Sequence, residues 1–169
     1  MHHSPSAVLT IQPLQSEQIA AVKQMIMTVW SEIWGDVLTP AEIRELDDMQ
    51  DINHARSHYF DNGGTFLVLL EAEQVVGTGA IRKLDDAICE LKRMWLLQAY
   101  RGRGWGQQLA DQLLDFAYQA GYQKVRLDLA DAQRQAPALN FYQKLGFYPI
   151  DRYNNGLCTV FMEKALAKT

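Results

Sequence analysis

Apolar residues in the first third of the chain recur at intervals of three and four, the spacing of one helix face. The repeat runs from Ile19 to Ile33, with Ser16 in the N-cap position and Gly35 after the last apolar residue, and it predicts an amphipathic helix between them. The tetrapeptide TPAE at 39–42 has the capping-box pattern, which predicts a second helix extending to about residue 59. A short apolar stretch before both helices, 8–11, predicts a strand.

The spacing changes to that of strands in the middle of the chain. Three stretches are apolar or alternating and are separated by short turns, which predicts an antiparallel meander over 65–71, 75–84 and 87–97.

The last third returns to alternating helices and strands. A helix opens in the glycine-rich stretch at 102–106 and ends at Gly121, and a hairpin that turns at 154–156 closes the chain. The remaining predicted elements are a strand over 124–130, a helix over 136–145 and the two hairpin strands, 147–153 and 157–163. The order βααβββαβαββ indicates an α/β domain with a mixed, mostly antiparallel sheet flanked by helices.

Composition limits the class of protein. The 169 residues are 48% apolar and 21% charged, and no apolar run reaches the roughly 18 residues of a membrane helix. We therefore expect a single domain over 1–169, with 1–7 flexible. The first residues lack the pattern of a signal peptide and the cysteines form no CxxC, so a cytoplasmic location is expected. The net charge of −4 does not favour a nucleic-acid partner, and no membrane partner is expected.

The stretch RGRGWG at 101–106 is the first candidate for chemistry. It lies between a predicted strand and a predicted helix, where glycines, unpaired helix amides and arginines together favour a bound pyrophosphate over a solvated loop. No Lys-Ser/Thr follows, so it is not a P-loop. The glycine spacing approaches that of a dinucleotide-binding fold, with Asp128 in place of the ribose-binding acid, but the meander upstream does not fit that fold's βαβ crossovers.

Two motifs make the chain resemble the GNAT superfamily of N-acetyltransferases, which bind acetyl-coenzyme A (acetyl-CoA). The loop fits [Q/R]-x-x-G-x-[G/A] at 101–106, and ALNFYQKLGF at 138–147 fits A-x-x-[LF]-Y-x-K-x-G-F. The segment ELKRMWL at 90–96 resembles the family's fourth strand. Gln98 and Gln135 depart from the turn former and the asparagine that are common at those positions. The motifs span about 89–147, and the element order extends the resemblance over most of the chain.

The resemblance implies acetyl-CoA as co-substrate and assigns its contacts to the backbone. Amides of 101–107 would hold the pyrophosphate, and Met94 and Leu96 would pair with the pantetheine arm where the fourth and fifth strands splay apart. The Met94 amide would polarise the thioester carbonyl. Lys144 is a solvated charge or a contact to a phosphate. The candidate cofactor-binding residues are Met94, Trp95, Leu96, Arg101, Gly102, Arg103, Gly104, Trp105, Gly106, Gln107 and Lys144.

Two side chains are candidates for proton transfer. Tyr142 is the general-acid candidate, because a phenol with a pKa near ~10 stays protonated at neutral pH and can donate to a thiolate whose thiol has a pKa near ~8.5. The alternative is a core tyrosine. Glu90, in a strand expected to be buried, resembles the base of histone-type members. It is either that base or a charge paired with Lys92, and a water chain is a third route for the proton.

Several other conspicuous residues have two interpretations. Trp30 and Trp34, close to Glu32 and Asp36, lie in the region that shapes the acceptor pocket in this family, so they form either an aromatic and acidic wall for an amine cation or part of the core.

Histidines and cysteines give weaker signals. His54 and His58 have a metal-chelating spacing on the predicted second helix but no third ligand, so surface histidines and no metal are expected. Cys89 and Cys158 are expected to be buried residues rather than nucleophiles.

The predicted function is an acetyl-CoA-dependent N-acetyltransferase. The resemblance implies direct attack by a primary amine, from a small molecule or a peptide, in a ternary complex, and homodimers are common in the family. Two alternatives stay open: a dinucleotide-binding oxidoreductase and a non-catalytic acyl-CoA-binding module.

Overall fold

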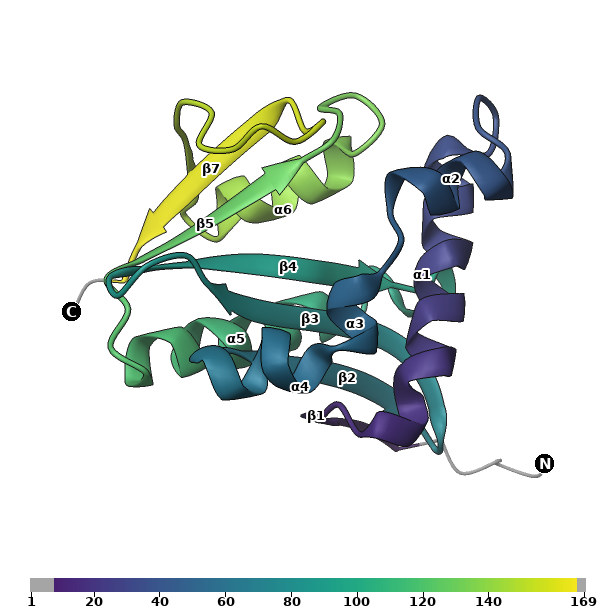
Figure 1. Ribbon diagram of the computed structural model, residues 1–169, viewed down its shortest axis with the longest axis horizontal. Coiled ribbons are helices and arrows are strands. Elements are labelled where there is room, and N and C mark those ends of the chain that lie inside the picture. Colours follow the sequence, from purple (N-terminus) through teal and green to yellow (C-terminus); the bar gives the residue numbers. More distant parts are fainter. Residues whose placement is uncertain (1–7, 167–169) are drawn as a thin grey trace.

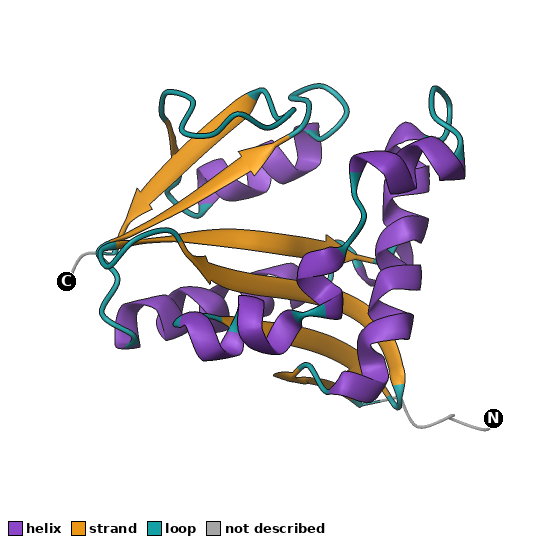
Figure 2. Ribbon diagram, viewed as in Figure 1, coloured by secondary structure: helices purple, strands orange, loops and turns teal. Residues whose placement is uncertain are grey.

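The computed structural model describes residues 8–166, so the predicted flexible segment 1–7 lies outside the described residues. Seven strands form one mixed sheet, with helices on both faces (Figures 1 and 2). The strands, in the spatial order β1-β2-β3-β4-β5-β7-β6, are β1 (Leu9–Pro13), β2 (Thr65–Glu71), β3 (Gln74–Lys83), β4 (Ile88–Leu96), β5 (Lys124–Leu129), β6 (Tyr148–Pro149) and β7 (Val160–Ala165). The helices are α1 (Ile19–Trp34), α2 (Pro40–Leu46), α3 (Gln50–Asn53), α4 (Ala55–His58), α5 (Trp105–Gln119) and α6 (Ala136–Lys144).

The predicted α/β class and the order of the long elements are confirmed. The β2–β3–β4 meander is antiparallel, and among the described strands only β4 and β5 pair in parallel. A dinucleotide-binding fold is built from successive parallel βαβ units. The sheet therefore does not support the oxidoreductase alternative. Among the described residues, no helix is both long and apolar enough to cross a membrane.

One apolar cluster lies on each face of the sheet. The predicted stripe of α1 buries Val22, Ile26 and Val29 on one face, together with residues of α3 and α4. On the other face α5 buries Leu109 and Leu113, and α6 packs into the same cluster. Burial of each stripe, at roughly 25 cal/mol per Å² of apolar surface, holds the helices against the sheet.

The predicted capping box is present, but the second predicted helix is broken. Thr39 and Glu42 exchange side-chain and backbone hydrogen bonds at the start of α2. The helix ends at Leu46, because the carboxylates of Asp47 and Asp48 then accept from backbone amides two residues ahead. Short helices α3 and α4 follow. Ser16 is not the cap of α1, because Gln15 caps a 3-10 turn that precedes it.

The predicted C-terminal hairpin is wrong in extent. β6 has only two residues, and a long loop leads to β7. Arg152 holds this loop by donating to the carbonyl oxygens of Asn154, Gly156 and Cys158. The loop bends toward β4 and β5, where the Tyr153 hydroxyl donates to Glu90. The local bonds of Arg152 and the distant contact between Tyr153 and Glu90 replace the regular ladder that the local pattern predicts.

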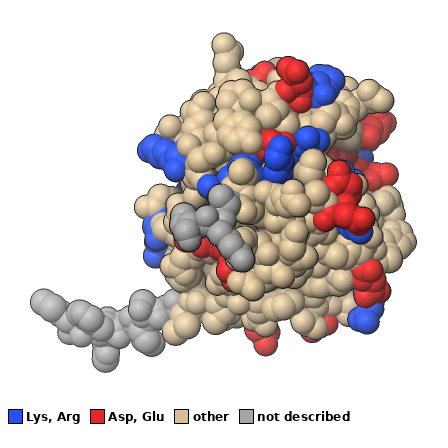
Figure 3. Space-filling view, turned by 90° about the vertical axis from the view of Figure 1, so that its left-hand side faces the viewer, with Lys and Arg blue, Asp and Glu red and all other residues tan. Residues whose placement is uncertain are grey.

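The side of the molecule at the left of Figure 1 carries both signs of charge. Figure 3 shows basic side chains near the centre of that face and acidic ones mainly toward its right. The turn between β3 and β4 lies on this side, with Lys83 paired to Asp86 at 2.9 Å. At the start of β5, Lys124 lies 3.4 Å from Glu163. The Lys83–Asp86 pair is exposed and contributes little to stability, whereas the carboxylate of Glu163 is buried.

Candidate active site

A cleft opens where β4 and β5 separate. The two strands pair only through Ile88, Cys89 and Glu90 of β4, although both strands continue beyond that point. In Figure 1 their ribbons start close together and then diverge. Residues of β4, β5, α1, α2, α6 and the 150–159 loop line the resulting cavity of about 510 Å³. The splay expected from the family resemblance is therefore present, and it exposes one backbone edge of β4.

A β-bulge re-aims β4 inside this cleft. Thr78 and Ala80, two residues apart on β3, pair with Trp95 and Lys92, three residues apart on β4. The extra residue is Arg93, whose φ of 56° lies in the left-handed region. It reverses the alternation of the strand, so Met94 packs on the α5 side and Trp95 on the α1 side. The buried Thr78 hydroxyl donates to the Arg93 carbonyl at 2.6 Å and holds the bulge from β3.

The Arg93 side chain holds the bulge from the opposite direction. Its guanidinium makes two contacts with Asp47, at 2.5 and 2.9 Å, and two with Asp51, at 3.0 and 2.6 Å. Tyr59 also donates to Asp51. Burial opposes ionisation of Asp51, but the hydrogen bonds and charge of Arg93 outweigh it and hold the pKa of that carboxyl below its usual value. These four residues, called the Arg93 cluster below, tie β4 to α2 and to the α3–α4 segment.

Tyr142, the general-acid candidate, lies in the wall of the cleft. It is 6% exposed, with its ring packed edge-on against Phe141 and Phe147. Burial raises the pKa of its phenol above the usual value. A phenol in this state stays protonated at neutral pH, as donation to a thiolate requires.

Glu90 is fully buried, as predicted, but it is heavily paired. Its carboxylate lies 3.0 Å from Arg82 and 3.4 Å from Lys92, and it accepts from Tyr153 at 2.5 Å. It is absent from the residues that line the cavity. The structure therefore favours the paired-charge alternative over direct proton transfer from an amine to Glu90. Burial of the Tyr153 phenol, and after it the negative charge of Glu90, raises the pKa of that phenol.

Two polar side chains order the end of β5. Gln135 is 5% exposed and accepts hydrogen bonds from the backbone amides of Ala130 and Asp131, at 2.8 and 3.2 Å. Although asparagine is more common at this position in the family that the chain resembles, Gln135 therefore has a defined role in ordering the backbone after β5. Asp128 lines the cavity and accepts from the Asn154 amide at 2.9 Å.

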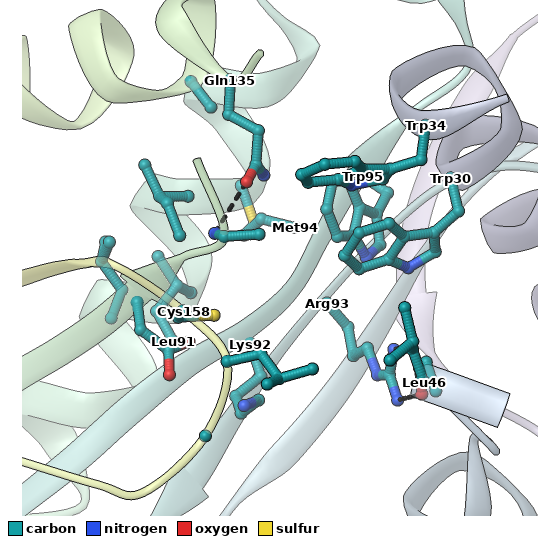
Figure 4. Close-up of a pocket in the computed structure, with 18 of the residues that line it drawn as sticks. Trp30, Trp34, Leu46, Leu91, Lys92, Arg93, Met94, Trp95, Gln135 and Cys158 are labelled. Carbon is teal, nitrogen blue, oxygen red and sulfur yellow. Dashed lines mark hydrogen bonds and ion pairs between the residues drawn. The ribbon is translucent and has the colours of Figure 1, made fainter. Parts of the chain in front are cut away.

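Three tryptophans form a wall of the cavity. Figure 4 shows Trp30, Trp34 and Trp95 grouped on one side, with Met94 between them and Leu91 and Cys158. The rings of Trp30 and Trp95 are 5.4 Å apart, and α1 supplies Trp30 and Trp34. This placement favours the aromatic-wall interpretation over a purely core role for the two α1 residues.

The two acidic neighbours of those tryptophans are paired elsewhere. Glu32 lies 2.9 Å from Arg101, and Asp36 lies 2.7 Å from Arg134. Neither lines the cavity, so the acidic part of the predicted wall is not formed by these residues.

The glycine-rich loop turns sharply into α5. Gly102 and Gly104 have φ of 72° and 87°, and a Cβ added at either would meet nothing within 4 Å. The first backbone bond of the helix joins Gln108 to Gly104, so it leaves the amides of Trp105, Gly106 and Gln107 available. No side chain of a described residue caps these donors. The backbone here is both uncovered and rich in donors, which suits an anion.

The charged side chains near this loop have different surroundings. Arg101 donates to the Leu96 carbonyl as well as to Glu32, so its side chain ties the loop to β4 and α1. Arg103 is exposed and donates to Ala99. Lys144 is exposed in the last turn of α6 and does not line the cavity.

The predicted histidine pair does not lie on one continuous helix. His54 separates α3 from α4, and its ring contacts the Gln50 carbonyl. Within 8–166, no group of three potential ligands is arranged to hold a metal. Burial raises the pKa of the Cys89 thiol to about 12, and burial followed by the charge of Asp128 raises that of Cys158 to about 11. Neither thiol is activated as a nucleophile.

Comparison with known proteins gives a consistent family match. The model of the Acetyltransferase (GNAT) family matches residues 23–147. N-acetyltransferase 8B of Homo sapiens is 36% identical over 105 residues, which cover 59% of this chain and 44% of that protein. This chain spans about half the length of several curated relatives that it matches.

Two further comparisons cover nearly the whole chain. IAA acetyltransferase of Azospirillum brasilense is 30% identical over 158 residues, covering 91% of this chain and 94% of that protein. The structure of the PaiA N-acetyltransferase of Thermoplasma acidophilum in complex with coenzyme A has a TM-score of 0.76 at 19% identity, covering 94% of this chain and 99% of that one. The second comparison supports the fold.

Proposed function

Because the chain belongs to the acetyltransferase (GNAT) family, we propose that it transfers an acetyl group from acetyl-CoA to a primary amine. The observation that carries this proposal is the bulged, splayed β4, which brings an open backbone edge and Tyr142 to one cavity.

The residues near the start of α5 fit the phosphates of acetyl-CoA. Backbone amides of 101–107 would hold the pyrophosphate, as the uncovered glycines and the free donors of the first helical turn support. Arg101 would act through the position of the loop, since its guanidinium is already engaged by Glu32. The exposed Arg103 and Lys144 would supply screened charge to the outer phosphates. The coenzyme A complex of the Thermoplasma relative agrees with this choice of co-substrate.

The exposed edge of β4 fits the pantetheine arm. Beyond Glu90 this edge has no partner in β5, so Met94 and Leu96 can exchange backbone hydrogen bonds with the amides of the arm. Trp95 would contact the arm from the cavity wall. The bulge gives the Met94 amide a fixed direction, and we assign it to the thioester oxygen, where negative charge develops as the amine attacks.

The chemical step needs proton movements at both the nitrogen and the sulfur. The amine nitrogen forms a bond to the thioester carbon, the carbon–sulfur bond breaks, and the sulfur leaves with the electron pair. Tyr142 would donate its phenolic proton to that sulfur. The ammonium group would lose one proton to water before attack, because Glu90 is paired with Arg82, Lys92 and Tyr153. The nitrogen would lose a second proton as the amide forms, and water would return this proton to the Tyr142 phenolate.

The experiment that tests this function combines binding and turnover. Acetyl-CoA should raise the melting temperature of the protein in a saturable way, whereas NADH should not. A panel of primary amines should then accelerate release of free coenzyme A thiol. Protection by acetyl-CoA without acceleration by any amine would support a non-catalytic binding module instead, and protection by NADH alone would contradict the proposal.

A further inference from the structure

The part of the cavity between α1 and β5 has its own chemistry. Trp30 and Trp34 lie on one side and the 156–158 segment lies on the other, near Asp128 of β5. Apolar residues that also line the cavity include Leu38, Ile43, Leu46 and Leu157. Leu46 and Leu157 are 57% and 76% exposed, so they mark the outer rim.

Asp128 differs from every other charged residue in the lining. Asp47 and Arg93 are bonded to one another, and Lys92 is paired with Glu90. Within the described part of the chain, Asp128 has a neutral partner, Asn154, but no cation in contact. A half-buried carboxylate without a cation is unfavourable, because it has lost part of its hydration and gained no opposite charge. A bound ammonium group would supply that charge.

The three tryptophans of the wall also bury polar groups that lack hydrogen-bond partners in the described part of the chain, which is unfavourable in free energy. The indole N–H groups of Trp30, Trp34 and Trp95 are buried, and no acceptor for them is found among residues 8–166. An unpartnered buried donor costs free energy that an aliphatic residue would avoid, so three of them in one wall call for an explanation. Their buried nitrogens leave ring carbons to face the cavity, which makes the wall an apolar, aromatic surface.

Resting on the proposed acetyltransferase activity, we propose that the acceptor is a primary amine with an aromatic body. Its ammonium group pairs with Asp128, and its ring lies against Trp30 and Trp34. Asn154 is a positioning residue that orients the Asp128 carboxylate. The reaction then follows the balance given above: the ammonium group gives one proton to water before its nitrogen attacks, Tyr142 protonates the departing sulfur, and the second nitrogen proton returns through water to Tyr142.

The first experiment compares 2-phenylethylamine with ethylamine and putrescine in the thiol-release assay. Burial of the phenyl group against the wall predicts a KM for 2-phenylethylamine about ten- to a hundredfold below that of ethylamine. Putrescine, whose second cation would meet the apolar rim, is expected to be the poorest of the three. Equal KM values for 2-phenylethylamine and ethylamine would overturn the aromatic part of the proposal.

Two variants separate the contacts. Asp128→Asn should raise the KM for 2-phenylethylamine about ten- to a hundredfold and leave the KM for acetyl-CoA unchanged. Trp30→Leu should raise the KM for 2-phenylethylamine but not for ethylamine, since only the first has a ring. Asp115→Asn, which removes the same charge from the exposed side of α5, is the matched control and should change neither KM. An unchanged KM in Asp128→Asn would overturn the ammonium site.

A binding measurement distinguishes failure of this proposal from failure of the proposed function. Benzyltrimethylammonium has a ring and a cation but cannot be acetylated. In the presence of coenzyme A, benzyltrimethylammonium should raise the melting temperature of the wild type and of Asp115→Asn but not of Asp128→Asn. Neutral benzyl alcohol should change the melting temperatures of all three proteins equally. If this pattern holds and no amine is acetylated, only the activity is wrong. If amines without rings are acetylated and the pattern is absent, only the inference about the acceptor is wrong.

Discussion

Removal of the Arg93 side chain tests what keeps β4 bulged. In the folded protein its guanidinium is 11% exposed and is shared by Asp47 and Asp51, which are 19% and 16% exposed. Arg93→Ala deletes the cation and leaves two carboxylates facing each other in a partly desolvated site. Arg93→Gly deletes the same contacts but removes the Cβ from a backbone position with φ of 56°.

Two terms decide the size of the effect. Breaking a buried ion pair by removal of one partner costs about 3–5 kcal/mol, because the remaining charge is uncompensated. A left-handed conformation costs a residue other than glycine roughly 1 kcal/mol, which Arg93→Gly no longer incurs. We therefore expect Arg93→Ala to lose about 3–5 kcal/mol of unfolding free energy and Arg93→Gly to lose up to about 1 kcal/mol less. Small domains have a total unfolding free energy of about 5–15 kcal/mol, so both variants should still fold at low temperature.

Urea unfolding followed by circular dichroism measures these differences, and the thiol-release assay measures their effect on turnover. If the bulge relaxes, the Met94 amide moves away from the thioester, and kcat should fall by up to about 10²-fold, as expected for loss of one oxyanion donor. The triple variant Arg93→Met/Asp47→Asn/Asp51→Asn serves as the control. It removes all the charges together, so it should recover part of the lost stability without recovering kcat.

Two results would refute this reasoning. Unfolding free energies of Arg93→Ala within about 0.5 kcal/mol of the wild type, the usual range for surface substitutions, would show that the Arg93 cluster contributes no net stability. Full kcat in the relaxed variants would show that turnover does not depend on the bulge. The second result would also remove the Met94 amide from the proposed mechanism.

Further substitutions probe the remaining parts of the site. Tyr142→Phe should lower kcat by roughly 10²-fold and leave protection by acetyl-CoA intact; an unchanged kcat would exclude Tyr142 as the acid. Gly104→Glu places a carboxylate beside the proposed pyrophosphate and should abolish that protection, whereas Gly121→Glu, which has a similar positive φ and open space at the other end of α5, should lose stability only. Glu90→Gln should destabilise the protein in urea without changing the shape of the pH–rate profile, and a changed shape would restore Glu90 as the base. The lowered pKa of Asp51 means that its ion pair stabilises the fold above the unfolded-state pKa and that this contribution is lost as the pH falls through the folded-state pKa. The difference in stability between the wild type and Asp51→Asn should therefore vanish in acid, and a constant difference would contradict the ion pair.

The sequence pattern predicts correctly those elements that are determined by residues close together in the chain. The stripe of α1, the capping box at Thr39 and the β2–β4 meander depend on residues within a few positions of one another. The breaks at Asp47 and in the 150–159 loop combine local hydrogen bonds with contacts to distant partners. Asp47 meets Arg93, and Tyr153 meets Glu90. A periodicity argument does not contain those contacts, so it extended a helix and a hairpin too far.

The same difference applies to the candidate site. A motif indicated Tyr142 and the glycine loop. In the sequence Asp128 fits only the pattern of a dinucleotide-binding fold, and no pattern marks Thr78. The sequence does hold one clue to the Arg93 cluster: Arg93 lies in a strand expected to be mostly buried, and three aspartates occur within 47–51 in a predicted helix. Opposite charges in two segments that must both pack on one sheet are candidates for a buried pair.

The bulge and the splay of β4 have a common physical origin. A bulge increases the local twist of a strand, so a strand that pairs regularly up to Glu90 is turned away from its parallel neighbour as it approaches Arg93. Thr78 and the Arg93 cluster fix that turn from two sides, and the cavity is the space that results. The opening that we propose for a pantetheine arm therefore depends on side chains that need not touch the arm. For this reason, variants of Arg93 should weaken acetyl-CoA binding and stability together, whereas variants of Tyr142 should change turnover alone.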